Sequence, residues 1–78
     1  MKMIVITAKK SFSHDAYYHN CISDGEYETI TETWGLTEGY GFPVILLCED
    51  EKHITVFDPE ERAVLFGIPK DKVTVRDA

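Results

Sequence analysis

Apolar positions fall into short runs along this chain, and most of these runs predict β-strands. Residues 3–8 (MIVITA) are β-branched and apolar, which favours a buried strand. Residues 43–49 (PVILLCE) form a continuous apolar run that is typical of a central strand, and Pro43 suits the first position of such a strand. Residues 53–57 (HITVF) and 72–76 (KVTVR) predict two more strands, the first of them antiparallel to the central one.

Other segments have patterns that are harder to assign. Residues 27–34 (YETITETW) place some apolar residues at helical spacing, but they are dense in Thr, Tyr, Ile and Trp, so we predict a strand. Residues 9–25 contain many turn-forming residues and no clean period, which predicts a long loop with one helical turn around residues 15–19. Residues 35–41 (GLTEGYG) are rich in glycine and predict a connection.

The sequence DPEERAVLFG, which begins at Asp58, carries the signals of a short helix. Asp58 has the side chain of an N-cap, Pro59 stands at the first helical position, and Glu61 completes an Asp-x-x-Glu capping pattern. Gly67 suits the residue that follows a helix. We therefore predict a helix over residues 59–66.

The segment between the two central strands predicts a tight hairpin turn at residues 51–52. This register pairs Cys48 with Thr55 and Leu46 with Phe57, and alternate residues then lie on opposite faces. The face predicted to form the core carries Ile45, Leu47, Ile54 and Val56. The opposite face carries Val44, Leu46, Cys48, Asp50, His53, Thr55 and Phe57. Because one end of this second face is apolar, we expect the predicted helix to cover it.

The predicted order is strand, long loop, three strands, short helix and strand, within a single small domain over residues 1–78. In architecture this order resembles small, partly open SH3-like barrels, and it also permits a meander sheet with a helix on one face. We therefore predict a β-rich fold, all-β or α+β. A chain of this size buries only about 60–65% of its unfolded surface, so an elaborate catalytic pocket is disfavoured and a partner or a dimer is more attractive.

Charge is distributed unevenly along the chain, whose net charge is −6. No Lys or Arg occurs from Ser11 to Glu51. The acidic residues of this window are Asp15, Asp24, Glu26, Glu28, Glu32, Glu38, Glu49, Asp50 and Glu51. A field of one sign repels phosphate backbones and attracts basic surfaces. We therefore predict no direct binding of nucleic acid and a protein partner with a basic surface, with simple solubility as the alternative explanation.

The sequence also bears on the compartment. No run approaches the roughly 18–20 apolar residues that span a bilayer, and the apolar run at residues 3–6 is too short for a signal peptide. We expect a cytoplasmic protein without a membrane partner, in which Cys21 and Cys48 are reduced thiols.

The residue types of a zinc site are present, but their spacing is not typical of one. His19, Cys21, Cys48 and His53 are the candidate ligands for a tetrahedral site, and the predicted hairpin places the last two on one face. No Cys-x2-Cys or His-x3-His pair occurs. We therefore expect no cofactor, with Cys48 buried as a small core residue and His53 exposed in a turn, and we keep a zinc-stabilised domain as an alternative.

Catalytic motifs are equally weak. Cys21 stands near His19, but no family signature surrounds it, and acidic neighbours disfavour a thiolate. The glycines of residues 35–41 lack the lysine of a phosphate-binding loop. We predict that the protein is not an enzyme.

Aromatic residues gather within the acidic window, at Tyr17, Tyr18, Trp34, Tyr40 and Phe42. Tyr and Trp anchor interfaces because they bury a large area with little loss of entropy. If the long loop folds against the central hairpin, these rings line a groove for a basic segment or, by analogy with SH3 recognition, a proline-rich peptide. The alternative is that Trp34 and one tyrosine lie in the core.

The leading hypothesis is a small acidic protein-binding module. It would dock on a basic surface of a nucleic-acid-handling protein, as an inhibitor or a mimic of nucleic acid. The predicted partner-binding residues are Tyr17, Tyr18, Glu26, Glu28, Glu32, Trp34 and Tyr40.

Overall fold

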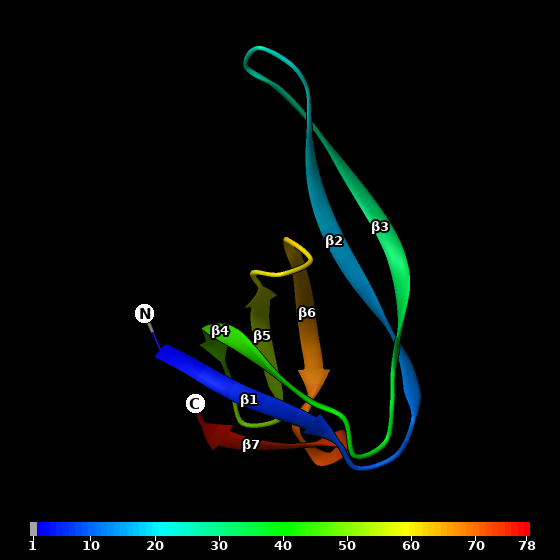
Figure 1. The fold of residues 1–78 in the computed structure, drawn as a ribbon, viewed down its shortest axis with the longest axis vertical. Helices are drawn as coiled ribbons and strands as arrows, with labels where there is room; N and C mark the ends of the chain where they lie inside the picture. Colours follow the sequence, from blue (N-terminus) through cyan, green and yellow to red (C-terminus); the bar gives the residue numbers. More distant parts are fainter. Residues whose placement is uncertain (1) are drawn as a thin grey trace.

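The computed structural model describes residues 2–78, apart from the side chains of residues 19–23, 26 and 27. The described chain forms seven strands and one short 3-10 helix. These are β1 (Lys2–Ala8), β2 (Phe12–Ser23), β3 (Glu26–Leu36), β4 (Gly41–Glu49), β5 (His53–Asp58), β6 (Ala63–Pro69), η1 (Lys70–Lys72) and β7 (Val73–Asp77). All neighbouring strands are antiparallel, in one sheet with the order β3-β2-β6-β5-β4-β1-β7 (Figure 1).

The prediction of a β-rich fold is confirmed, and the fold is all-β. The sheet is open, with β3 and β7 at its edges, so the barrel part of the prediction is not confirmed. The runs that predicted strands all lie in strands, within a residue or two at the ends. In the described part of the chain, no helix is long and apolar enough to cross a membrane.

The core lies on one face of the sheet. Its buried residues come from six of the seven strands and are Ile4, Ile6, Ala16, Val44, Ile54, Val56, Ala63, Leu65, Ile68 and Val73. Figure 1 shows β2 and β3 rising as a long twisted hairpin beyond the other strands. Strand β2 pairs with β6 only from Ala16 to Tyr18, so most of the hairpin is a two-stranded ribbon.

The loop predicted over residues 9–25, with its helical turn, is wrong, because residues 12–23 form strand β2. The hairpin turns at Asp24 and Gly25, and Gly25 has the positive φ of 79° that such turns require. An Asp-Gly pair between two strands is a strong hairpin signal. The apolar period of β2 is hidden because Ala16 and Tyr18 occupy its inward positions, in place of larger aliphatic residues.

The helix predicted over residues 59–66 is also wrong. The Asp58 Oδ1 accepts hydrogen bonds from the backbone N–H groups of Glu60 (3.0 Å) and Glu61 (3.4 Å), as an N-cap would. The chain then reverses through Arg62, which has a φ of 55°, and residues 63–69 pair with β5. Capping chemistry therefore closes a hairpin turn here, because alternate residues of β6 find partners in the core of the sheet.

The predicted turn of the β4–β5 hairpin is confirmed, but the predicted register holds only near that turn. Cys48 pairs with Thr55 as expected, whereas Leu46 pairs with Val56 instead of Phe57. A β-bulge at Leu47 inserts the extra residue.

The bulge reverses the inward and outward positions of the first half of β4. Val44 is fully buried and Leu46 packs against the core, while Leu47 is 50% exposed. The predicted core face is therefore wrong for Ile45 and Leu47. It is right for Ile54 and Val56, which lie on β5 and are both buried. A single inserted residue exchanges the two faces because side chains in a strand alternate.

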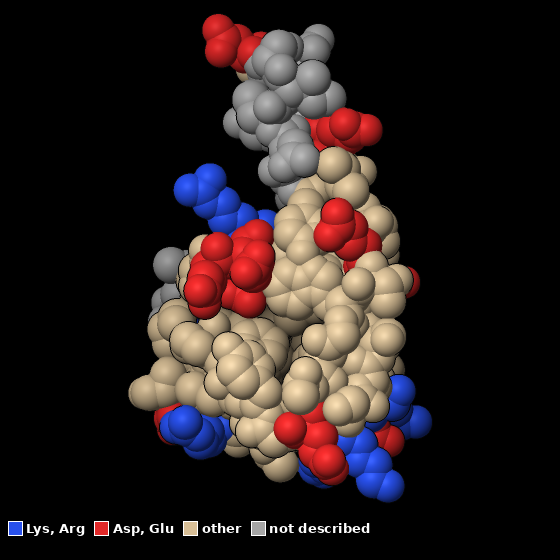
Figure 2. Space-filling model, turned by 45° about the vertical axis from the view of Figure 1, so that its right-hand side comes forward, with Lys and Arg blue, Asp and Glu red and all other residues tan. Residues whose placement is uncertain are grey.

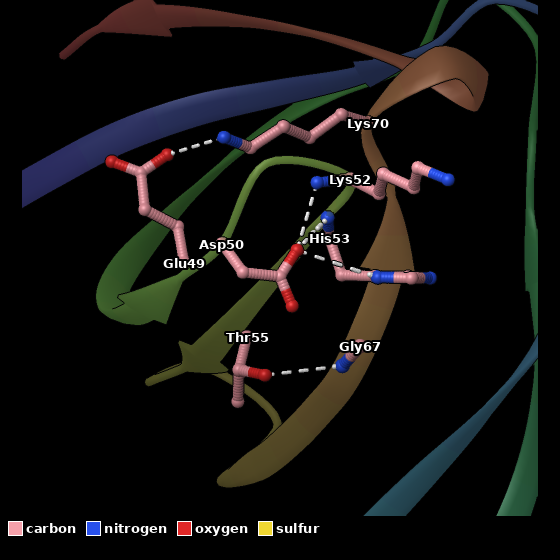
Figure 3. Close-up of polar contacts among 7 residues, drawn as sticks. All are labelled: Glu49, Asp50, Lys52, His53, Thr55, Gly67 and Lys70. Carbon is pink, nitrogen blue, oxygen red and sulfur yellow. Dashed lines mark hydrogen bonds and ion pairs between the residues drawn. The ribbon is translucent and has the colours of Figure 1, made fainter.

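Polar contacts stabilise the β4–β5 turn and its neighbours on β6 (Figure 3). The Asp50 Oδ1 accepts hydrogen bonds from the backbone N–H groups of Lys52 (2.8 Å) and His53 (2.7 Å). These backbone hydrogen bonds hold the pKa of the Asp50 carboxyl below its ordinary value. A second bulge lies in β6, where Gly67 has a φ of 66° and donates its N–H to Thr55 Oγ1 at 3.1 Å.

Replacing Asp50 with alanine is expected to lower the urea midpoint of unfolding at pH 7. The folded-state pKa of Asp50 is depressed, so its contribution is present above the unfolded-state pKa of about 3.9 and is lost as the pH falls through the lower folded-state value. The difference between wild type and Asp50→Ala should therefore shrink below about pH 4. Glu51→Ala, in the same turn, is the control; an equal effect there would contradict the assigned role of Asp50.

Replacing Thr55 with valine is expected to lower the free energy of unfolding by about 1–2 kcal/mol, because the Gly67 N–H loses its acceptor. Chemical denaturation measures this change. Thr31→Val makes the same substitution on an exposed position of β3 and should be close to neutral. Equal stabilities of the two variants would show that the bulge does not depend on the hydroxyl.

Candidate binding groove

A groove of about 400 Å³ lies between the β2–β3 hairpin and the β5–β6 turn. It is lined by Tyr18, Trp34, Gly35, Leu36, Thr37, Tyr40, Phe42, Asp58, Glu60 and Glu61. Figure 2 shows this side of the molecule, with acidic groups on the flanks of a hollow. Tyr18, Trp34 and Phe42 also pack against the core, so the aromatic part of the groove has a firm base.

The first aromatic pair of the groove joins the two strands of the hairpin. Tyr18 on β2 and Trp34 on β3 lie on the same face, on either side of the cross-strand pair Ala16–Glu32. Their ring centroids are 5.9 Å apart, and the Trp34 Nε1–H donates a hydrogen bond to the Tyr18 hydroxyl. The small side chain of Ala16 leaves room for the two rings to lean toward each other.

The second aromatic pair consists of Tyr40 and Phe42. Their rings stack with centroids 5.8 Å apart and an angle of 22° between the planes. The connection that carries Tyr40 is fixed to the sheet, because the Gly39 N–H donates to the Ala8 carbonyl of β1 at 2.9 Å. Within the connection, the Tyr40 N–H donates to the Thr37 carbonyl at 3.1 Å. Tyr40 nevertheless remains 61% exposed, so its side chain is open to a ligand.

The acidic wall of the groove comes from the β5–β6 turn. Asp58 is buried and accepts a backbone hydrogen bond within the turn, while Glu60 and Glu61 are exposed. Among the described residues no Lys or Arg lines the groove, and Arg62, next in the chain, is not part of its lining. The ion pairs of the described residues lie elsewhere, at Lys2–Asp77, His53–Asp50 and Lys70–Glu49.

The pKa of Tyr18 reports the local electrostatics. Burial raises the pKa of its phenol above the ordinary value, and the hydrogen bond from Trp34 acts in the opposite direction. The carboxylates of Glu32, Glu61 and Asp58 raise it further. Carboxylates from β3 and from the β5–β6 turn therefore act on the same point of the groove, and their combined potential is negative.

The structure brings together some of the predicted partner-binding residues and separates others. Tyr18, Trp34 and Tyr40 line one groove, and Glu32 stands beside it. Tyr17 points to the other face of the sheet, where its ring contacts Phe66 at 6.2 Å. Glu28 is exposed on β3, in the part of the hairpin that extends past β6, and the side chain of Glu26 lies outside the described residues.

Sequence reasoning missed the acidic wall. Asp58, Glu60 and Glu61 were assigned to the first turn of a helix, which hid their position opposite the aromatic residues. The sequence feature that marks this acidic wall is the cluster of acids at the end of strand β5 and directly after it.

The predicted burial of Cys48 is wrong. Its thiol is free and exposed, because the bulge at Leu47 places Cys48 on the opposite face of the sheet from Val44 and Leu46. His53 is exposed as predicted, and the two residues line a shared opening with Phe66. No group of three potential metal ligands occurs among the described side chains. The side chains of His19 and Cys21 lie outside them, so the zinc and thiol-catalysis hypotheses are untested.

Comparison of the chain with protein-family models, with curated proteins and with solved structures finds no match.

Replacing Tyr18 with phenylalanine is expected to lower the free energy of unfolding by about 0.5–1.5 kcal/mol at pH 7, because Trp34 loses its acceptor. A raised folded-state pKa also means that ionisation of Tyr18 disfavours the folded state as the pH rises above about 10. Tyr18→Phe should therefore lose less stability than wild type at alkaline pH. Urea unfolding, followed by the fluorescence of the single tryptophan, measures both effects. Tyr40→Phe is the control, and a similar response there would contradict the assignment.

Proposed function

We propose that this protein is a non-enzymatic binding module whose groove receives a basic segment of another protein. The observation that carries the proposal is the lining of the groove, where two aromatic pairs lie opposite carboxylates. No Lys or Arg of the described residues is part of this lining. The chain's net charge of −6 adds attraction at longer range.

The carboxylates favour a cationic ligand. The exposed carboxylates of Glu60 and Glu61 make no ion pair within the described part of the chain, so a cation of the partner would meet them without displacing an internal one. Phosphate groups would be repelled by the same charges, which argues against direct binding of nucleic acid. A charged ligand bound here is partly exposed, so its affinity should fall as salt rises.

The aromatic residues favour a protein segment over a small cation. Rings that are already held by packing lose little entropy on binding and present a large apolar area, which is the property of interface anchors. Basic segments of this kind are common on nucleic-acid-handling proteins, where they contact phosphates. A module that occupies such a segment would act as an inhibitor or a mimic of nucleic acid.

A proline-rich peptide is the second candidate ligand. The two separate aromatic pairs along one groove favour it, because such peptides dock on aromatic-lined grooves. Binding of this ligand would depend weakly on salt, whereas binding of a basic segment would depend on it strongly.

The proposal is tested with a cationic peptide, (Gly-Lys)4, titrated into the protein by calorimetry at low and high salt. The double variant Glu60→Lys/Glu61→Lys should weaken binding at low salt by about tenfold, because each reversal removes an attraction and adds a repulsion. Glu51→Lys/Asp71→Lys changes the net charge equally at exposed positions outside the groove, and it should weaken binding by less than about threefold. Equal losses in the two variants, or no binding by wild type, would overturn the proposal.

A further inference from the structure

We infer that the groove selects arginine over lysine, so that the partner segment it takes is arginine-rich. This inference rests on the proposed function, and it names the side chain that the geometry fits. It draws on three features of the groove, namely an open aromatic ring, a second fixed ring and carboxylates on the opposite wall.

The open ring is that of Tyr40. One of its faces stacks on Phe42, with the planes only 22° apart, so its exposed surface includes the opposite face. A guanidinium group is planar and weakly hydrated, and it stacks on such a face, whereas the ammonium of lysine is compact and strongly hydrated. The backbone hydrogen bonds of Gly39 and Tyr40 hold the main chain at Tyr40, and the stack on Phe42 orients its ring.

The second ring is that of Trp34, the best aromatic partner for a cation. Its Nε1–H is already satisfied by the Tyr18 hydroxyl, and it packs against the core, so it stays in a fixed orientation. Tyr40 and Trp34 both line the groove, which gives successive cationic side chains of an extended segment an aromatic surface each.

The carboxylates complete the match to arginine. Glu60 and Glu61 line the same groove and are exposed, and they stand on a turn that Asp58 fixes. A carboxylate accepts two parallel hydrogen bonds from a guanidinium, and a lysine side chain cannot form this arrangement. Stacking on one side and paired hydrogen bonds on the other both require a flat, forked cation.

The chain itself supplies a related contact elsewhere. The Lys72 ammonium lies over the Phe12 ring at 5.1 Å, outside the groove. Cation–π contact is therefore already used in this fold, whereas no described Lys or Arg lines the groove.

The test compares (Gly-Arg)4 with (Gly-Lys)4, which carry the same charge, by calorimetry on the full chain. Wild type should bind the arginine peptide about three to ten times more tightly. Tyr40→Leu should weaken binding of the arginine peptide more than binding of the lysine peptide, and so reduce this preference to about twofold or less. Tyr40→Phe keeps an aromatic face and should keep the preference.

Phe66→Leu is the matched control, since Phe66 is also 61% exposed but does not line the groove. It should leave the preference unchanged, and far-UV circular dichroism of each variant establishes that it is folded. Equal affinity of wild type for the two peptides, with both weakened by Glu60→Lys/Glu61→Lys, would overturn the arginine inference and leave the proposed function standing. Retention of the preference in Tyr40→Leu would overturn the assignment of Tyr40, and absence of binding by either peptide would overturn both proposals.

Discussion

The groove depends on the narrow junction between the long β2–β3 hairpin and the rest of the sheet. Strand β2 pairs with β6 at three positions only, from Ala16 to Tyr18. The pair farthest from the tip of the hairpin is Ala16–Leu65, and both residues are fully buried. Tyr18 pairs with Ala63 within this junction, and Trp34 pairs with His14 next to it, so both rings lie near the β5–β6 turn as well as the core.

The β5–β6 turn serves both the fold and the groove. The Asp58 carboxylate accepts backbone hydrogen bonds that close the turn, and the same turn then presents Glu60 and Glu61 outward. A helix at this place would have used the same capping chemistry and given the acids different neighbours. The acidic wall is therefore a consequence of how β5 and β6 pair, because their pairing fixes where the turn stands relative to the hairpin.

Aromatic and acidic residues contribute different properties to the groove. The rings are partly buried against the core or stacked on one another, so they are rigid and define its shape. The exposed carboxylates are solvated and define its charge. Shape and charge recognise different features of a ligand, and an arginine side chain carries both a flat surface and a positive charge.

The sequence by itself determined where most strands lie and which chemistry is available. Apolar runs such as residues 43–49 predict a strand whatever its neighbours in the sheet are. The acidic residues between Ser11 and Glu51 are likewise present in any fold of the chain. The aromatic residues of the groove could be predicted as binding candidates from their residue types alone. Their gathering could not be derived, because it depends on the pairing of β2 with β3 and with β6.

Only the tertiary structure decided the remaining features. The bulge at Leu47 exchanges inward and outward positions without any local signal, since either set of apolar residues on β4 could fill the core. Residues 58–67 carry helix signals, yet Ala63 and Leu65 are buried by neighbouring strands, and the segment forms a turn followed by an extended strand. Local preferences of about a kcal/mol per residue are small beside the burial of a side chain. The long-range pairing of strands therefore placed Asp58, Glu60 and Glu61 opposite the aromatic residues, and with them the groove.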